Sequence, residues 1–164
     1  KWKNTNMLYS LLCARDLLKF DTIVSYGDIL YNSEIIKELK SSKCNLTFAY
    51  DPNWKKLWSK RFENPLDDAE TFRINSKGYI KDIGSKTNDY SKIQGQYMGI
   101  FKLKGGVIFK YLENLKKFNF EKSDMTSFLS ELIKNRKSIK GIPYTKKWAE
   151  LDSPSDLKFF YEIT

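Results

Sequence analysis

The stretch of residues 21–30, Asp-Thr-Ile-Val-Ser-Tyr-Gly-Asp-Ile-Leu, constrains the fold more than any other part of the sequence. Its β-branched run, Thr22–Val24, favours a strand that is buried on both faces, as in a parallel sheet. Gly27 relaxes the backbone, and Asp28 stands where this strand would end. Ligands of open α/β sheets bind beyond the carboxyl ends of the strands, so Asp28 is a candidate ligand for a hard cation. The alternative is that Asp28 caps a turn, as Gly-Asp pairs often do.

The bulk composition predicts one globular domain over residues 1–164, because the chain is 164 residues long and 41% hydrophobic. Lys and Arg number 29 against 20 Asp and Glu, and the net charge of +9 attracts polyanions. The basic residues are spread along the chain, which argues against a nucleic-acid-binding patch. No apolar run approaches the roughly 18 residues of a membrane span, and no signal peptide opens the chain. We therefore expect a cytoplasmic protein without nucleic-acid or membrane partners.

The sequence contains no histidine. This absence excludes Ser-His-Asp and Cys-His catalysis, and it leaves carboxylates, lysines and backbone amides as the chemical groups. The two cysteines alone make no zinc site.

Hydrophobic periodicity predicts helices and strands in alternation. The expected elements are a helix over about residues 6–19, the strand beginning at 22, a helix through 35–39 capped by Asn32 or Ser33, a strand over 45–50, a helix through 54–61, a β-hairpin over 70–83, a strand over 94–103, a helix over 107–117, a helix over 126–134 started by Ser123 or Asp124, a strand over 138–142, and a helix from 153 to about 161. The alternation favours an α/β fold with a doubly wound, mainly parallel sheet that carries an inserted hairpin.

Two tryptophans on the predicted helix through 54–61 admit two interpretations. Trp54 and Trp58 lie four residues apart on one helical face, a pattern typical of core packing. The functional alternative is cation–π capture of an alkylammonium group.

Two further carboxylates precede the last predicted helix. Glu150 and Asp152 alternate in an extended segment, which places them on one side of the chain. If this segment lies beside the strand that ends at Asp28, three carboxylates converge in an all-oxygen site that suits Mg²⁺. The alternative is that Glu150 is solvated and Asp152 only shields the helix start.

Lys86 follows Ile83-Gly84-Ser85 at the end of a hairpin strand. Its ammonium group could face a phosphate there. The alternative, in a chain so rich in lysine, is an ordinary surface charge.

The order of several short motifs resembles the nucleoside-diphosphate-sugar pyrophosphorylase type of nucleotidyltransferase. The motifs are Thr5–Leu11 (TNMLYSL), Ser25–Asp28 (SYGD), Ile83–Lys86 (IGSK), Gln96–Phe101 (QYMGIF) and Trp148–Asp152 (WAELD). Residues 54–72 and 125–129 are most similar to bacterial cytidylyltransferases that activate phosphoglutamine for capsule biosynthesis; relatives activate phosphocholine or 2-aminoethylphosphonate. The resemblance spans nearly the whole chain and implies a Rossmann-like three-layer fold.

The resemblance also implies roles for individual residues. Asp28 and Asp152 would bind Mg²⁺ with Glu150 as a third or outer-shell carboxylate, and Lys86 would neutralise the acceptor phosphate. The expected substrate-binding residues are Asn6 and Ser10 beside the nucleotide, Tyr26, Gln96 and Tyr97 within the quoted motifs, and Arg61, Asp68 and Glu70 around the acceptor pocket. The implied reaction transfers CMP from CTP to a small phosphorylated zwitterion and releases pyrophosphate.

One feature of the family has no counterpart here. In such enzymes the glycine-rich phosphate loop lies well before the helix that corresponds to the opening helix of this sequence, and Gly105-Gly106 stands in another place and context. We expect that the N-terminal third is missing from this sequence. The alternatives are a non-catalytic remnant of the transferase fold and a basic nucleic-acid-binding module; the acceptor, the base and the oligomeric state, a homodimer included, stay open.

Overall fold

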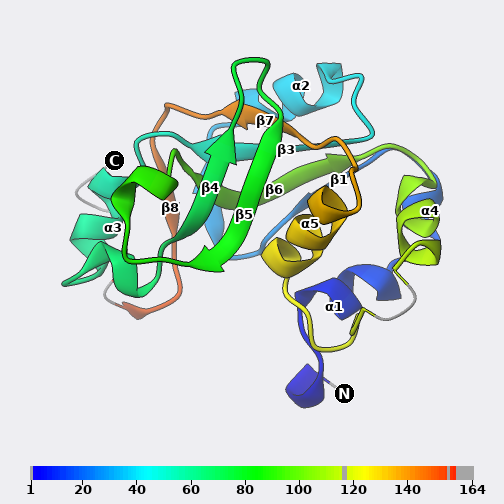
Figure 1. The fold of residues 1–164 in the computed structure, drawn as a ribbon, viewed down its shortest axis with the longest axis horizontal. Helices are drawn as coiled ribbons and strands as arrows, with labels where there is room; N and C mark the ends of the chain where they lie inside the picture. Colours follow the sequence, from blue (N-terminus) through cyan, green and yellow to red (C-terminus); the bar gives the residue numbers. More distant parts are fainter. Residues whose placement is uncertain (1, 116–117, 155, 158–164) are drawn as a thin grey trace.

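The computed structural model describes residues 2–115, 118–154, 156 and 157. A four-stranded mixed sheet crosses the molecule, with a β-hairpin beside it and helices around it (Figure 1). The strand order of the sheet is β1 (Thr22–Ser25), β6 (Gln96–Leu103), β3 (Leu46–Asp51), β7 (Lys140–Pro143). The hairpin pairs β4 (Glu70–Ile74) with β5 (Ile80–Lys86), and a separate ladder pairs β2 (Ile29–Tyr31) with β8 (Trp148–Glu150).

Five α-helices and four short 3₁₀ turns occur within the described residues. The helices are α1 (Met7–Cys13), α2 (Glu34–Ser41), α3 (Trp54–Arg61), α4 (Val107–Glu113) and α5 (Met125–Lys134); the 3₁₀ turns are η1 (Trp2–Asn4), η2 (Leu17–Lys19), η3 (Pro65–Asp67) and η4 (Tyr90–Lys92). Helix α2 packs against β1, β3 and β6, while α5 packs against β5 and contacts α1. None of these helices combines the length and the apolar character that crossing a bilayer requires.

The α/β class, the mixed sheet and the inserted hairpin are confirmed, but the predicted strand directions need correction. Among the described strands of the main sheet, β3 and β7 form the one parallel pair; β6 runs opposite to the other three strands and forms antiparallel pairs with β1 and β3. Strand β1 pairs with β6 alone and is half-buried, so it lies at the edge of the sheet instead of its centre. β-branched residues favour any strand, and the sequence of one strand does not specify its partner.

Local signals predicted the start of two helices correctly. Asn32 precedes α2, and its side chain accepts a hydrogen bond from the backbone N–H of Glu34. At α5 the cap is Asp124, whose carboxylate accepts from the N–H of Ser127 at 2.7 Å. Such caps satisfy N–H groups that have no partner inside the helix.

The predicted helix over 6–19 is shorter than expected. Asn6 caps α1, but the helix ends at Cys13, and the chain continues through a turn into η2. Helix α4 was predicted to reach Lys117 but ends at Glu113, and residues 116–117 lie outside the described part. The last helix was predicted to about Tyr161, and residues 155 and 158–161 also lie outside it.

The core lies around β3, all six residues of which are buried. Phe48 of β3 packs edge-on against Phe72 of the hairpin, so the main sheet and the hairpin share one apolar interior. Trp54 and Trp58 are both 4% exposed, which confirms that they belong to the core. Trp58 also carries an indole N–H, which needs a hydrogen-bond partner when it is buried.

Gly99 fixes the position of Tyr26. Its φ of 77° lies in the left-handed region, and an added Cβ would stand 2.6 Å from the Tyr26 ring. The Gly99 carbonyl accepts a hydrogen bond from the Tyr26 N–H at 2.9 Å. Only glycine combines this backbone conformation with such a close approach.

We predict that Gly99→Ala lowers the free energy of unfolding by about 1–3 kcal/mol, because alanine is strained at positive φ and displaces Tyr26. Urea denaturation of the two proteins measures the difference. The matched control is Gly27→Ala, where no atom lies within 4 Å of the added Cβ; its effect should stay below about 0.5 kcal/mol. Equal effects of the two substitutions would contradict this role for Gly99.

Candidate functional site

The ladder between β2 and β8 brings the predicted acidic residues together. Ile29 lies opposite Glu150 in this antiparallel pair. One step beyond it, the Leu151 N–H donates to the Asp28 carbonyl at 2.8 Å. This pairing places the backbone of Asp28 beside Leu151, the residue before Asp152, although the two segments are far apart in the sequence.

Arg61, at the end of α3, binds the carboxylates of this region. Its guanidinium donates to Glu150 and Asp152 at 2.5 Å each and to Asp156 at 3.0 Å. The Arg61 side chain is only 4% exposed. Arg61, which the resemblance placed around the acceptor pocket, is the centre of an ion-pair cluster and is not among the residues that line the small cavity described below.

The electrostatics of the cluster follow from burial and from Arg61. Burial raises the pKa of Glu150; Arg61 lowers it, and the charges of Asp152 and Asp28 raise it further, so the net shift is upward. Burial also raises the pKa of Asp156, but hydrogen bonds from Ser153 and Arg61 bring it below the ordinary value. The pKa of Arg61 itself is raised, because the carboxylates outweigh the effect of burial.

The predicted convergence of three metal-binding carboxylates is not what the structure contains. No group of three or more acidic or thiol side chains within the described residues is arranged to hold a metal ion. Arg61 forms ion pairs with Glu150 and Asp152. The exposed Asp28 side chain makes no hydrogen bond or ion pair with any described residue. As oxygen donors, Asp28 and the half-exposed Asp152 fit Mg²⁺, which commonly takes one or two carboxylates plus waters and substrate oxygens. Glu150, buried against Arg61, does not fit as a direct ligand.

A cavity of about 240 Å³ collects most of the other predicted residues. Its walls include Tyr26, Asp68, Glu70, Lys86, Gln96, Tyr97 and Glu150. We call it the small cavity. Lys86, at the end of β5, lies opposite Glu70, at the start of β4. The register of the hairpin therefore places both charged side chains at the small cavity.

Hydrogen bonds hold the polar groups of the small cavity in position. The Lys86 ammonium donates to the carbonyls of Asp67 and Asp68 at 3.1 and 2.9 Å. The Trp58 indole N–H donates to the Asp68 carboxylate at 2.9 Å. The Tyr97 hydroxyl is buried next to Tyr26 and has no hydrogen-bond partner of good geometry within the described residues. The hydrogen bond between Trp58 and Asp68 was not predicted from the sequence. The one available signal was that a tryptophan on a buried helix face needs a partner for its indole N–H.

A second cavity, of about 720 Å³, lies beside the small one. Asn6 and Ser10, which the resemblance placed beside the nucleotide, contribute to its walls together with Tyr26 and Asp28. We call it the large cavity. Tyr26 lines both cavities and therefore stands between them. Asn6 is partly committed to structure, because its side chain caps α1 and donates to the Lys122 carbonyl.

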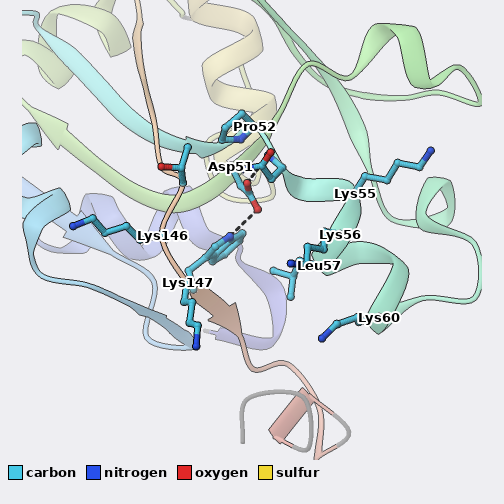
Figure 2. Close-up of a pocket in the computed structure, with 11 residues that line it drawn as sticks. Asp51, Pro52, Lys55, Lys56, Leu57, Lys60, Lys146 and Lys147 are labelled. Carbon is cyan, nitrogen blue, oxygen red and sulfur yellow. Dashed lines mark hydrogen bonds between the residues drawn. The ribbon is translucent and has the colours of Figure 1, made fainter. Parts of the chain in front are cut away.

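A lysine-rich groove of about 770 Å³ lies on the α3 side of β8 (Figure 2). Its lysines come from α3 and from the loop before β8: Lys55, Lys56, Lys60, Lys146 and Lys147. At its floor the Trp148 indole donates to Asp51 at 2.8 Å. Two of the lysines already have partners, because Lys146 pairs with Glu34 and Lys55 lies over the Tyr90 ring. The groove gives this flank of β8 a positive field that attracts anions.

Comparisons with known proteins agree with this geometry. No family model matches the chain. The chain is 37% identical to the CTP:phosphoglutamine cytidylyltransferase of Campylobacter jejuni subsp. jejuni, over 96% of this chain and 68% of that protein.

Two solved structures have the same fold. The inositol-1-phosphate CTP transferase from T. maritima superposes with a TM-score of 0.75 at 18% identity, covering 99% of this chain and 62% of that one. A Bacillus anthracis protein assigned as a glucose-1-phosphate thymidylyltransferase gives 0.70 at 16% identity, covering 96% and 60%. The chain thus spans about two thirds of the curated relative and somewhat less of these structures.

The Arg61 cluster generates a stability prediction. Arg61→Ala should lower the free energy of unfolding by about 2–4 kcal/mol, because Glu150 and Asp156 would stay buried without a counter-ion. Arg61→Lys should lower the free energy of unfolding by a smaller amount, because lysine keeps the positive charge. Some loss should remain, because lysine lacks the planar guanidinium that reaches three carboxylates. Urea denaturation measures both. Lys19→Ala, which removes an exposed ion pair, is the control and should change nothing measurable; an Arg61→Ala variant as stable as this control would refute the role.

Proposed function

This chain belongs to the cytidylyltransferase family within the nucleotidyltransferase superfamily, and from that premise we propose that it transfers CMP from CTP to a small phosphorylated zwitterion. The acceptor class is phosphoglutamine or a similar molecule, such as phosphocholine or an aminoalkylphosphonate. The activated product would serve the modification of a surface polysaccharide such as a capsule. The relative's name supports the nucleotide and the acceptor class, and the cavities support the chemistry.

The proposed reaction is a direct displacement. A phosphate oxygen of the acceptor attacks the α-phosphorus of CTP, the new P–O bond forms, and the bond to the β-phosphate breaks as pyrophosphate leaves with the electron pair. The attacking oxygen is already ionised at neutral pH, so no general base is required, in keeping with a chain that lacks histidine. The task left to the protein is to place two anions in line and to neutralise their charge.

The two cavities divide this task between them. CTP would occupy the large cavity, where Asn6, Ser10 and Asp28 lie, and the acceptor the small one. Mg²⁺, held by Asp28 and Asp152, would supply positive charge to the triphosphate. Tyr26 stands between the cavities and therefore sets the direction in which the acceptor meets the nucleotide.

The charges of the small cavity suit a zwitterion. Lys86 can neutralise the acceptor phosphate, while Asp68 and Glu70 can receive a cationic amine. Burial raises the pKa of Glu70, Asp124 and Asp68 raise it further, and Thr126 and Lys86 oppose them. A carboxylate in this environment gains more from a cationic partner than a solvated one does. The observation that carries the proposal is this gathering of one lysine and two acids next to the Asp28–Asp152 pair.

The alternative of a nucleic-acid-binding module relied on three aromatic residues of predicted strands, Tyr79, Tyr97 and Phe101, and of these Tyr79 is half-buried and lies outside the main sheet. Stacking on bases requires exposed rings on a sheet face. Phe101 is 1% exposed, and Tyr97 lies mostly within the interior.

We predict that Asp28→Asn lowers cytidylyl transfer at least about 100-fold, since the amide removes the charge proposed to hold Mg²⁺. A pyrophosphate-release assay of the full-length protein with CTP and a panel of phosphorylated zwitterions measures the rate, and circular dichroism verifies the fold. Glu113→Gln, at an exposed carboxylate on α4, is the control and should retain the parent rate. A parent-like rate in Asp28→Asn would refute the proposed site, and no pyrophosphate release with any acceptor would refute the proposed reaction.

A further inference from the structure

A separate basic hollow lies at the opposite end of β3 from the transfer site. Strand β3 runs from Leu46 to Asp51, and its Asp51 end pairs with Gln96, a wall residue of the small cavity. The hollow adjoins the other end, next to Asn45, and has a volume of about 500 Å³. It lies between α4 and the segment that follows α5.

The walls of this hollow carry positive charge only. Among the described residues that line it there is no carboxylate, and four carry cationic side chains: Lys43, Lys110, Arg136 and Lys137. None of the four makes an ion pair or a side-chain hydrogen bond with any residue in the described part of the chain. The lysine-rich groove of Figure 2 differs in this respect, because it contains Asp51 and its Lys146 is paired. Like charges that gather without counter-ions repel one another, and a bound anion relieves that repulsion.

Arg136 stands at a position that normally takes glycine. Its φ is 57°, the one positive φ at a non-glycine residue within the described part. The N–H of Arg136 donates to the Ile133 carbonyl and that of Lys137 to the Leu132 carbonyl, both at 2.9 Å, which is the Schellman arrangement at a helix end. A left-handed conformation is unfavourable for a side chain with a Cβ, and such positions cluster at functional sites. The turn alone would favour glycine at position 136. The presence of an arginine is better explained by the contribution of its side chain to the wall of the hollow.

Neutral hydrogen-bonding groups complete the lining. Tyr79, Tyr111, Asn114 and Ser138 add hydroxyl and amide groups to the four cations. A guanidinium fork, ammonium groups and hydroxyls together match the oxygens of a phosphate group. The excess of charge favours an anion with more than one negative charge over a monocarboxylate.

We propose that this hollow is a second anion site, which binds a small molecule carrying a di- or triphosphate group. The site is built from residues that take no part in the proposed transfer reaction, and its existence does not depend on that reaction. Two sources have the required chemistry, free pyrophosphate and the phosphate tail of a nucleoside triphosphate.

Titration of the ¹⁵N-labelled protein with sodium pyrophosphate, and separately with CTP, at constant ionic strength tests the proposal. We expect amide shifts at residues 43–45, 110–114 and 136–138 with at least one of the two anions, and the tighter binder identifies the source. Shifts confined to the neighbourhoods of Asp28 and Lys86 with both anions would overturn the proposal.

Two variants separate binding from folding. Arg136→Gly should weaken binding in the hollow about 10-fold, while its melting temperature stays equal to or above that of the parent, because glycine accepts the left-handed conformation. Lys110→Gln, which changes no backbone, should weaken binding in the same direction. Lys81→Gln, at an exposed lysine on β5, is the control and should bind as the parent does. Unchanged affinity in both Arg136→Gly and Lys110→Gln would overturn the proposal.

Discussion

The contact of Arg61 with three carboxylates ties together the parts of the chain that form the site. It joins the end of α3 to β8 and to the residues that follow β8. Because β8 is paired with β2, the same contact fixes the segment that carries Asp28. A buried guanidinium without acids, or buried acids without the guanidinium, would be strongly unfavourable, so these elements must assemble together.

The cluster also leaves a local charge opposite to that of the whole protein. Three carboxylates against one guanidinium leave two negative charges, and Asp28 adds a third nearby, within a chain of net charge +9. A triphosphate would be repelled by this spot unless a cation came with it. The positive charge of the whole chain attracts anions, whereas the proposed Mg²⁺ would offset the repulsion between these carboxylates and a triphosphate.

The sequence predicted what depends on neighbouring residues and missed what depends on distant ones. The caps of α2 and α5 and the turn of the hairpin are local signals, and these elements are confirmed. The pairing of β1 was wrong, because β-branched residues suit an edge strand as well as a central one. The β2–β8 ladder brings the segment of Asp28 beside that of Glu150 and Leu151, but nothing near Arg61 in the sequence indicated that it would pair with Glu150 and Asp152.

Tyr26 shows how such distant constraints shape a site. The sequence placed it between a predicted strand and Asp28, and the resemblance made it a substrate contact. The structure shows what positions Tyr26. Gly99 leaves the space into which the Tyr26 ring packs, and the Tyr97 ring meets it edge-on with 6.0 Å between the ring centroids. Burial then raises the Tyr26 pKa above its ordinary value, so the hydroxyl stays protonated and can donate a hydrogen bond at the boundary of the two cavities. In the proposed arrangement, a neutral donor between the two anionic substrates would contact both without adding to the negative charge that the reaction must overcome.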